Sequence, residues 1–268
     1  MKKVTSILIL ALVLTLFSAC AHMFQSPMIP RIQQRGELIV GTAGSMPPMN
    51  MTTRDGRIIG LEPDLAKYIA DSMGVKLRLE IMPFSELLPA LEAGKVDMIL
   101  SNMTIMPERN LKVAFVGPYF VSGKAFLTKI ERIASAEDTS EVDRPDVTLT
   151  TLNGSTSQYF VEDLIPRAKL VTAEDYDKAV AMVLRGEADA MMADYPICVV
   201  SVYRYPDAGL ISLITPLTYE PIGIALPAND AHMINFLENF LFSLEGSGGL
   251  EDLKKKWFEE GSWLEELP

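Results

Sequence analysis

The same order of secondary structure is expected twice along this chain, and this repetition limits the folds it can adopt. Each unit reads strand, helix, strand, helix, strand, the first over residues 38–101 and the second over residues 147–194. Apolar runs of strand length alternate there with segments whose apolar residues recur at the helical period. This order predicts an α/β protein with two mostly parallel sheets, each flanked by helices.

A short motif indicates that the two units share one plan. "LEAGKVDMIL" in the first unit and "VLRGEADAMM" in the second each contain a helix end, a glycine, a charged residue, an aspartate and an apolar strand. The helix expected over residues 61–74 has an apolar stripe of Leu61, Leu65, Tyr68 and Ile69. Residues 231–260 are expected to add two more helices to a lobe already formed.

The composition excludes several classes of function. The 268 residues are 49% hydrophobic, so a core can form without disulfides or a structural metal. The net charge of −11 repels nucleic acid. His22 and His232 are far apart in the sequence and Cys198 stands alone, so no metal-binding spacing is present. We expect neither a cofactor nor a nucleic-acid partner.

The first residues are typical of an export signal. Two lysines precede an apolar run over residues 7–17, which is too short to span a bilayer, and small residues follow it. "FSAC" resembles a lipobox, in which residues 1–19 are removed and Cys20 becomes the acylated first residue. The alternative is an A-x-A cleavage after residue 21, which would remove Cys20 and release an unanchored protein.

The segment after the signal is expected to be a tether. Residues 20–35 contain prolines and polar residues and show no sustained apolar period. No later stretch is long and apolar enough to cross a membrane. We therefore expect an exported protein, periplasmic or at the cell surface, that is lipid-anchored through Cys20.

Two polar loops lie at the carboxyl ends of predicted strands, where open α/β sheets bind ligands. The first, "SNMTIMPERN", opens a helix with Pro107, a residue suited to the first helical position. Arg109 then lies in the first turn, where the helix dipole disfavours a cation, and its presence indicates an anion in front of it. Its guanidinium can bind a carboxylate in a bidentate manner, with the hydroxyl of Thr104 beside it.

The second loop, "NGSTS", opens a helix of the second unit, so the N–H groups of Ser155 and Thr156 also favour an anion. Asp194, at the end of a predicted strand, offers the opposite charge to an ammonium. Together these residues predict a site for a small zwitterion. The alternative interpretation is that Arg109 forms a surface ion pair, while Asp194 and Ser155 or Thr156 cap helices.

Eight ordered stretches resemble a known family. They are "ELIVGT", "GRIIGLEPDLAKYIADSMGV", "FSELLPALEAGKVDMILSNMTIMPER", "FVGPYFVSGKAF", "NGSTS", "GEADAMMAD", "EPIGIAL" and "LEDLKKKWF". In this order, from Gly36 to Gly261, they resemble the extracellular solute-binding proteins, family 3, of amino-acid ABC importers, which have the type II periplasmic-binding fold. Any one stretch alone would be a weak match, but the ordered series of matches makes the resemblance to this family specific.

The resemblance implies two lobes joined by two hinge strands, near residues 119–123 and 218–222. Lobe 1 would comprise residues 36–121 and 221–268, and lobe 2 residues 122–220. A ligand that contacts both lobes would stabilise their closed form, which a membrane permease would then recognise. We expect a monomeric binding protein that catalyses no reaction.

The resemblance also implies roles for individual residues. The α-carboxylate would be held by Arg109, Thr104 and the N–H of Thr156, and the α-ammonium by Asp194 and the carbonyl of Asn102. Phe84 would form an aromatic wall for the ligand side chain. The residues expected at the ligand are Asn102, Thr104, Arg109, Ser155, Thr156, Asp194, Phe84 and Met46.

Departures from the family pattern bear on the ligand side chain. Relatives that bind basic or amide side chains tend to have an acid where this chain has Ala43, and many have an aromatic residue in place of Met46. Walls of Ala43, Met46, Met49 and Phe84 would leave a cationic side chain unpaired. We therefore expect a ligand with an uncharged or apolar side chain. Met106 replaces a residue that often caps the helix of Arg109, which would cost about 1 kcal/mol.

Two other functions remain open. Cyclohexadienyl and arogenate dehydratases resemble the same family and share features such as "VDRPDV" and "SGKAF", and the resemblance implies that such enzymes need an acid in the helix after the Asp194 position. Here "DYPICVV" offers only Cys198 there. A ligand-sensing adaptor would use the same body with a different partner.

Overall fold

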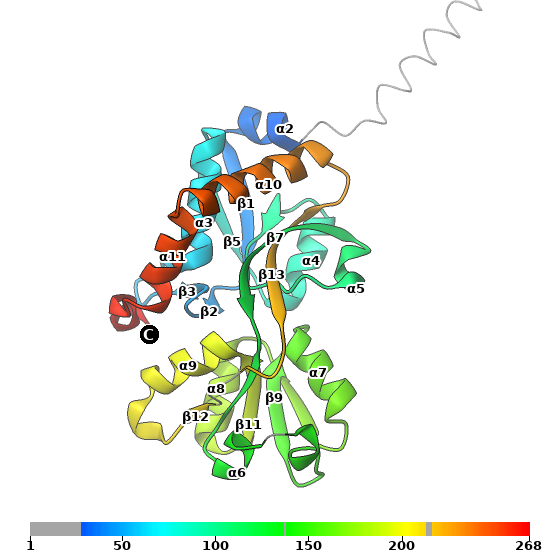
Figure 1. The fold of residues 1–268 in the computed structure, drawn as a ribbon, viewed down its shortest axis with the longest axis vertical. Helices are drawn as coiled ribbons and strands as arrows, with labels where there is room; N and C mark the ends of the chain where they lie inside the picture. The colour runs from blue at the N-terminus through cyan, green and yellow to red at the C-terminus, as the bar shows by residue number, and fades with distance from the viewer. Residues whose placement is uncertain (1–27, 137, 213–215) are drawn as a thin grey trace, which may run out of the picture.

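The structure is a computed structural model that describes residues 28–136, 138–212 and 216–268. Figure 1 shows two lobes joined by a pair of long strands. Each lobe is built on a five-stranded sheet with helices packed against it, so the predicted two-lobed α/β fold is confirmed. Within the described residues, none of the helices combines the length and the apolar content that a membrane span needs.

Lobe 1 contains a sheet with the strand order β5-β1-β6-β13-β7. β1 pairs in parallel with β5 and β6, whereas β13 runs antiparallel to β6 and β7. The elements of lobe 1 are α2 (Met28–Arg35), β1 (Glu37–Thr42), β2 (Ser45–Met46), β3 (Asn50–Thr52), β4 (Ile58–Ile59), α3 (Leu61–Met73), β5 (Lys76–Ile81), α4 (Phe84–Glu92), β6 (Met98–Ile99), α5 (Pro107–Asn110), β7 (Val113–Ser122), β13 (Glu220–Pro227), α10 (Ala231–Gly246), α11 (Gly249–Phe258) and the 3-10 turn η3 (Ser262–Glu266).

Lobe 2 repeats this plan with the strand order β10-β9-β11-β8-β12. β9 pairs in parallel with β10 and β11, and β8 runs antiparallel to β11 and β12. The elements are β8 (Lys124–Thr128), α6 (Glu131–Ala134), η1 (Thr139–Glu141), β9 (Thr148–Leu152), α7 (Thr156–Leu164), β10 (Lys169–Ala173), α8 (Tyr176–Arg185), β11 (Ala190–Asp194), α9 (Tyr195–Arg204), η2 (Pro206–Ala208) and β12 (Ile211–Ser212).

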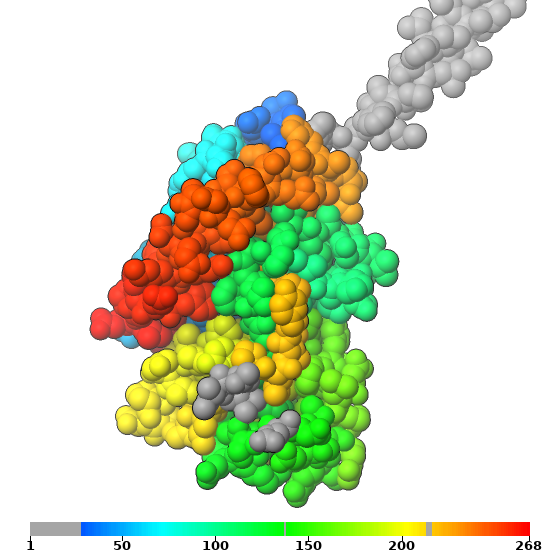
Figure 2. All heavy atoms as spheres, in the orientation of Figure 1, coloured from blue at the N-terminus to red at the C-terminus, as the bar shows by residue number. Residues whose placement is uncertain are grey.

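Two neighbouring strands carry the chain between the lobes. β7 leaves lobe 1 and leads directly into β8, and β13 brings the chain back. They pair in antiparallel register, with Glu220 opposite Ser122 at the lobe 2 end. In Figure 2 the gold segment of β13 crosses the junction of the lobes on the visible face. These are the two hinge strands that the sequence predicts.

The start of the body lies earlier in the chain than expected. Residues 28–35, predicted to be part of a tether, form α2, and its Met28 and Ile32 side chains are buried in the core of lobe 1. The Met28 N–H also donates to Asp230 Oδ2 at 2.5 Å, before α10. Two apolar side chains one helical turn apart are enough to fix a short helix on a core, although they are too few to give a sustained period.

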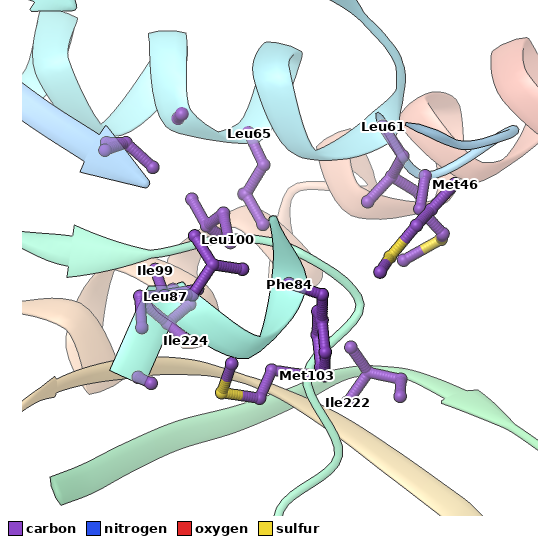
Figure 3. Close-up of a cluster of buried hydrophobic side chains, with 14 of the residues drawn as sticks. Met46, Leu61, Leu65, Phe84, Leu87, Ile99, Leu100, Met103, Ile222 and Ile224 are labelled. Carbon is purple, nitrogen blue, oxygen red and sulfur yellow. The ribbon is translucent and has the colours of Figure 1, made fainter. Parts of the chain in front are cut away.

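The core of lobe 1 lies between its sheet and α3, α4 and α10. In Figure 3, Leu65 from α3, Leu87 from α4 and Ile224 from β13 belong to one cluster of buried side chains. Tyr68, predicted to belong to the buried stripe of α3, is 44% exposed, so that assignment is wrong. The stripe also contains small buried residues of α3 such as Ala66 and Ala70, and these move its centre away from Tyr68.

The turn before α3 requires glycine. Gly60 has a φ of 137°, and a Cβ there would lie 2.3 Å from the carbonyl oxygen of Met49. Gly56 also has a positive φ, 83°, but a Cβ there would meet nothing within 4 Å. We expect Gly60→Ala to lower the free energy of unfolding by about 2 kcal/mol more than Gly56→Ala, because only Gly60→Ala adds an overpacking clash. Urea denaturation measures both variants, and equal losses would contradict the prediction.

Candidate functional site

Loops from both lobes meet beside the hinge strands and bring most of the predicted residues together. In lobe 1 the chain after β6 is held on β13, because the Ile105 N–H donates to Pro221 O at 2.7 Å. In lobe 2 the contributors are the start of α7 and the end of β11. We call this group the interlobe site, and it consists of Asn102, Thr104, Arg109, Lys124, Thr156, Asp194 and Glu220.

Arg109 is a buried cation, and among the described residues it donates hydrogen bonds to neutral groups alone. It lies in α5 after Pro107 and is 7% exposed. Its guanidinium donates from Nη1 to Thr104 O at 3.1 Å and from Nη2 to Gly154 O in lobe 2 at 3.3 Å. No carboxylate of the described residues lies within ion-pair distance of it, and burial lowers its pKa. The alternative of a surface ion pair is therefore wrong, and the guanidinium is suited to a carboxylate from outside the chain.

The ring of Phe84 lies beside this cation. Phe84 begins α4, is 5% exposed, and its ring centroid is 5.6 Å from the guanidinium carbon of Arg109. Figure 3 shows the ring between Met103 and Ile222. Met46 is 1% exposed and packs near Leu61 in the same core cluster, so the structure places its side chain in the core of lobe 1.

Asp194 is also buried, and it has partners within the protein. Its Oδ1 accepts from Lys124 Nζ at 2.5 Å, and its Oδ2 accepts from the side-chain amide of Asn102 across the junction of the lobes. Although Asp194 precedes α9, it makes no side-chain hydrogen bond to the start of that helix. The helix-cap interpretation of Asp194 is therefore wrong, and the carboxylate points into the interlobe site.

Lys124 and Glu220 are residues that the sequence interpretation did not assign to the site. Lys124 is 1% exposed, and its Nζ lies 3.6 Å from Glu220 Oε2 as well as beside Asp194. Glu220 also accepts from Thr156 Oγ1 at 3.3 Å and from Thr218 Oγ1 at 3.0 Å. The only sequence signal for Lys124 was its place in "SGKAF", directly after the first hinge strand.

Asn102 connects the two lobes through the hydrogen bond from its side chain to Asp194, and its backbone N–H is held by the buried acid Glu62. Its φ is 50°, the single positive value among the described non-glycine residues. Its N–H donates to Glu62 Oε1, which also accepts from the hydroxyl of Tyr119, while Glu62 Oε2 accepts from Asn50 Nδ2 at 2.5 Å. The Asn102 Oδ1 atom is buried and accepts no hydrogen bond from the described residues, so it can accept one from a ligand.

Glu62 is completely buried beneath the interlobe site. Burial raises its pKa, and this effect outweighs the hydrogen bonds from Tyr119, Asn102 and Asn50, which lower it. Glu62 follows Leu61 in α3, and helical period alone does not distinguish a buried acid from a solvated one.

Two predicted residues at the start of α7 have different roles: Thr156 lies in the interlobe site, whereas Ser155 caps the helix. Thr104 Oγ1 and Thr156 Oγ1 lie 3.4 Å apart across the two lobes, and the first N–H groups of a helix have no partner within it. Ser155 is the cap of α7: its Oγ accepts from Gln158 N at 3.2 Å and donates to Leu152 O at 2.7 Å. Because the Ser155 N–H is also bonded to Leu152 O, Ser155 keeps no free donor for a ligand, as the cap interpretation expected.

A cavity of about 570 Å³ opens beside Arg109 between the lobes. Apolar side chains such as Phe84, Met103 and Met106 line it together with Gly154 and Tyr159 of lobe 2, and four charged residues besides Arg109 also line it: Glu92, Glu108, Lys112 and Asp163. A cavity of this size accommodates a small ligand. Within the described part of the chain, no group of three His, Cys, Asp or Glu side chains is arranged to hold a metal ion.

Comparisons with known proteins identify the family. Residues 38–260 match the family described as bacterial extracellular solute-binding proteins, family 3. The chain is 25% identical over 246 residues to the cyclohexadienyl dehydratase of Pseudomonas aeruginosa, covering 92% of this chain and 91% of the relative. It is 24% identical over 223 residues to the ABC transporter arginine-binding protein 1 of Escherichia coli, covering 82% and 90%.

Solved structures agree with this match. A putative binding component of an ABC transporter from Wolinella succinogenes, complexed with lysine, is 38% identical with a TM-score of 0.82 and covers 86% of this chain and 99% of its own. A structure of the ancestral amino-acid-binding protein AncCDT-1, a precursor of cyclohexadienyl dehydratase, is 32% identical with a TM-score of 0.79, covering 86% and 99%. The chain belongs to the bacterial extracellular solute-binding proteins of family 3, and it has their type II periplasmic-binding fold.

Proposed function

We propose that this protein is the solute-binding component of an amino-acid ABC importer and captures one free amino acid between its lobes. The observation that carries the proposal is Arg109, a buried guanidinium with no carboxylate of the described residues within ion-pair distance. The ligand carboxylate would supply that charge, together with Thr104 and the N–H of Thr156. The ligand ammonium would bind near Asp194 and Asn102.

The balance of charges disfavours a ligand with a cationic side chain. Arg109 and Lys124 are two buried cations, and Asp194 and Glu220 are two buried carboxylates near them. A zwitterion adds one charge of each sign and leaves the interlobe site balanced. A cationic ligand side chain would need another ionised carboxylate in the site, because a charge buried without a partner is costly.

The residues that the family resemblance places around the ligand side chain favour an uncharged side chain. Met46, Met49 and Phe84 are buried in one core cluster, Ala43 packs against it, and none of these four carries a charge. Relatives carry names that differ in ligand, among them arginine, glutamine and L-cystine. We therefore infer the side-chain class from the residues of this chain.

The remaining parts of the proposal concern export and transport. Cys20 lies outside the described residues, and we propose that it anchors the exported protein to a membrane as a lipoprotein. The hinge strands would allow the lobes to close on the ligand, and a permease would recognise the closed monomer. This function needs no cofactor and no chemical step.

We expect neutral amino acids to bind at least about 30-fold more tightly than lysine or arginine, because the cationic side chains would lose their hydration without gaining a carboxylate. Isothermal titration calorimetry of the purified protein with each of the twenty amino acids measures this difference. Tight lysine or arginine binding without neutral amino-acid binding would overturn the side-chain inference. If none of the twenty amino acids bound, the whole function would be overturned.

A dehydratase is the second candidate, because one relative carries that activity in its name. α9 follows Asp194 and contains no acidic residue, and its buried Cys198 has a pKa raised by burial. The Cys198 thiol is therefore poorly suited to act as a general acid, and α9 supplies no carboxylic acid for that role. Conversion of prephenate or arogenate by the pure protein, followed by absorbance, would establish the enzyme instead of the binding protein.

A further inference from the structure

Lys124 is a second cation in the interlobe site, and its ion pair is built into lobe 2. Lys124 begins β8 and Asp194 ends β11, and the two are directly opposed residues of these antiparallel strands. The Lys124 Nζ atom lies 2.5 Å from Asp194 Oδ1, with side-chain exposures of 2% and 5%. Because both residues belong to one sheet, the pair does not depend on the closure of the lobes.

This pair changes what the site requires of a ligand. Where a buried carboxylate depends on the ligand for its counter-ion, a ligand without the ammonium leaves that charge unpaired and binds on the order of 100-fold more weakly. Here Asp194 is already paired with Lys124, which it shares with Glu220, and it accepts a hydrogen bond from Asn102. Loss of the ligand ammonium therefore leaves the Lys124 ammonium between two carboxylates, each of which also accepts a hydrogen bond from a neutral side chain.

A neutral polar group can take the place of the ammonium. The Asn102 Oδ1 atom is buried and accepts no hydrogen bond from the described residues. A hydroxyl on the carbon next to the ligand carboxylate can donate one hydrogen bond there, whereas a ligand with only hydrogen at that carbon cannot. Arg109 would still bind the carboxylate of such a molecule.

We propose that Lys124 acts as an internal counter-ion of Asp194, so that the protein binds 2-hydroxy acids as well as amino acids. This inference rests on the proposed function, because it uses the same site for the ligand carboxylate. It names Lys124 as the residue that sets how strongly the site discriminates between an α-ammonium and an α-hydroxyl.

The test compares three matched ligand pairs by calorimetry: L-methionine, L-leucine and L-phenylalanine, each with its (S)-2-hydroxy analogue. For the pair whose amino acid binds most tightly, we expect the wild-type protein to bind the hydroxy acid within about 10-fold of the amino acid. In Lys124→Met, Asp194 depends on the ligand for its counter-ion, and the hydroxy acid should weaken at least about 100-fold relative to the amino acid. Lys124→Arg keeps the cation and should keep the small difference.

The controls separate this inference from folding and from the proposed function. Lys178→Met removes an exposed lysine of lobe 2 that pairs with Glu174, and it should leave both affinities unchanged. If Lys124→Met does not fold, Lys124→Gln, which also removes the cation and keeps a hydrogen-bond donor, takes its place. A hydroxy acid that binds the wild-type protein more than about 100-fold more weakly than its amino acid would overturn the role of Lys124. If no amino acid binds at all, it is the proposed function that fails.

Discussion

Replacing Arg109 by methionine should weaken amino-acid binding by about 1000-fold or more. The guanidinium is buried, and its described hydrogen-bond partners are two carbonyl oxygens, so a ligand carboxylate would be its first anionic partner. Without it, that carboxylate would be buried with no counter-ion, which costs several kcal/mol. Calorimetry with the tightest-binding amino acid measures the loss.

The stability of the unliganded protein distinguishes a binding role from a structural one. Burial lowers the pKa of Arg109, which means that the folded protein disfavours its charge. We therefore expect Arg109→Met to unfold at the same urea concentration as the wild type or at a higher one. Arg57→Met is the matched control, because Arg57 is an exposed arginine of lobe 1 that pairs with Asp55. A large loss of stability in Arg109→Met with little loss of affinity would identify Arg109 as a structural residue.

The sequence predicted Arg109 because several local signals agree at one place. Pro107 marked the first turn of a helix, the preceding apolar run marked a strand end, and a cation in that turn is electrostatically unfavourable. The same kind of local signal located α3, α4, α7 and α8. Periodicity and helix caps are short-range features, so they can be read without the tertiary structure.

The residues that were missed depend on contacts between distant segments. Lys124 faces Asp194 only because β8 runs antiparallel to β11, a pairing that reverses the parallel order of its neighbours. Glu62 contacts Tyr119, which lies 57 positions further along the chain on β7. A buried acid and a solvated acid look alike in a helical pattern, and only the donors around them tell them apart. α2 was missed for a different reason, because a helix of eight residues gives too little periodicity to be recognised.

Glu62 should be the most important buried acid for stability. Its carboxyl accepts hydrogen bonds from Asn50, Asn102 and Tyr119, which come from three separate segments of lobe 1. Glu62→Leu would leave these buried donors without an acceptor, at about 1–3 kcal/mol for each unsatisfied group. We expect the free energy of unfolding to fall by about 3–5 kcal/mol, measured by urea denaturation. Asp71→Leu, at an exposed position of the same helix, should change it by less than about 0.5 kcal/mol.

The same residue should give stability a characteristic dependence on pH, which Glu62→Gln reveals because glutamine does not titrate. Burial raises the pKa of Glu62 above its ordinary value of 4.5, so the folded protein holds this proton more tightly than the unfolded chain. The contribution of Glu62 to stability is thus complete below pH 4.5 and declines as the pH rises through the raised pKa. The free energy of unfolding of the wild type minus that of Glu62→Gln should therefore decrease from pH 5 to pH 8. Asp71→Asn is the control for an exposed acid on α3. A difference that stays constant or increases over this range would mean that the three donors outweigh burial and hold Glu62 ionised.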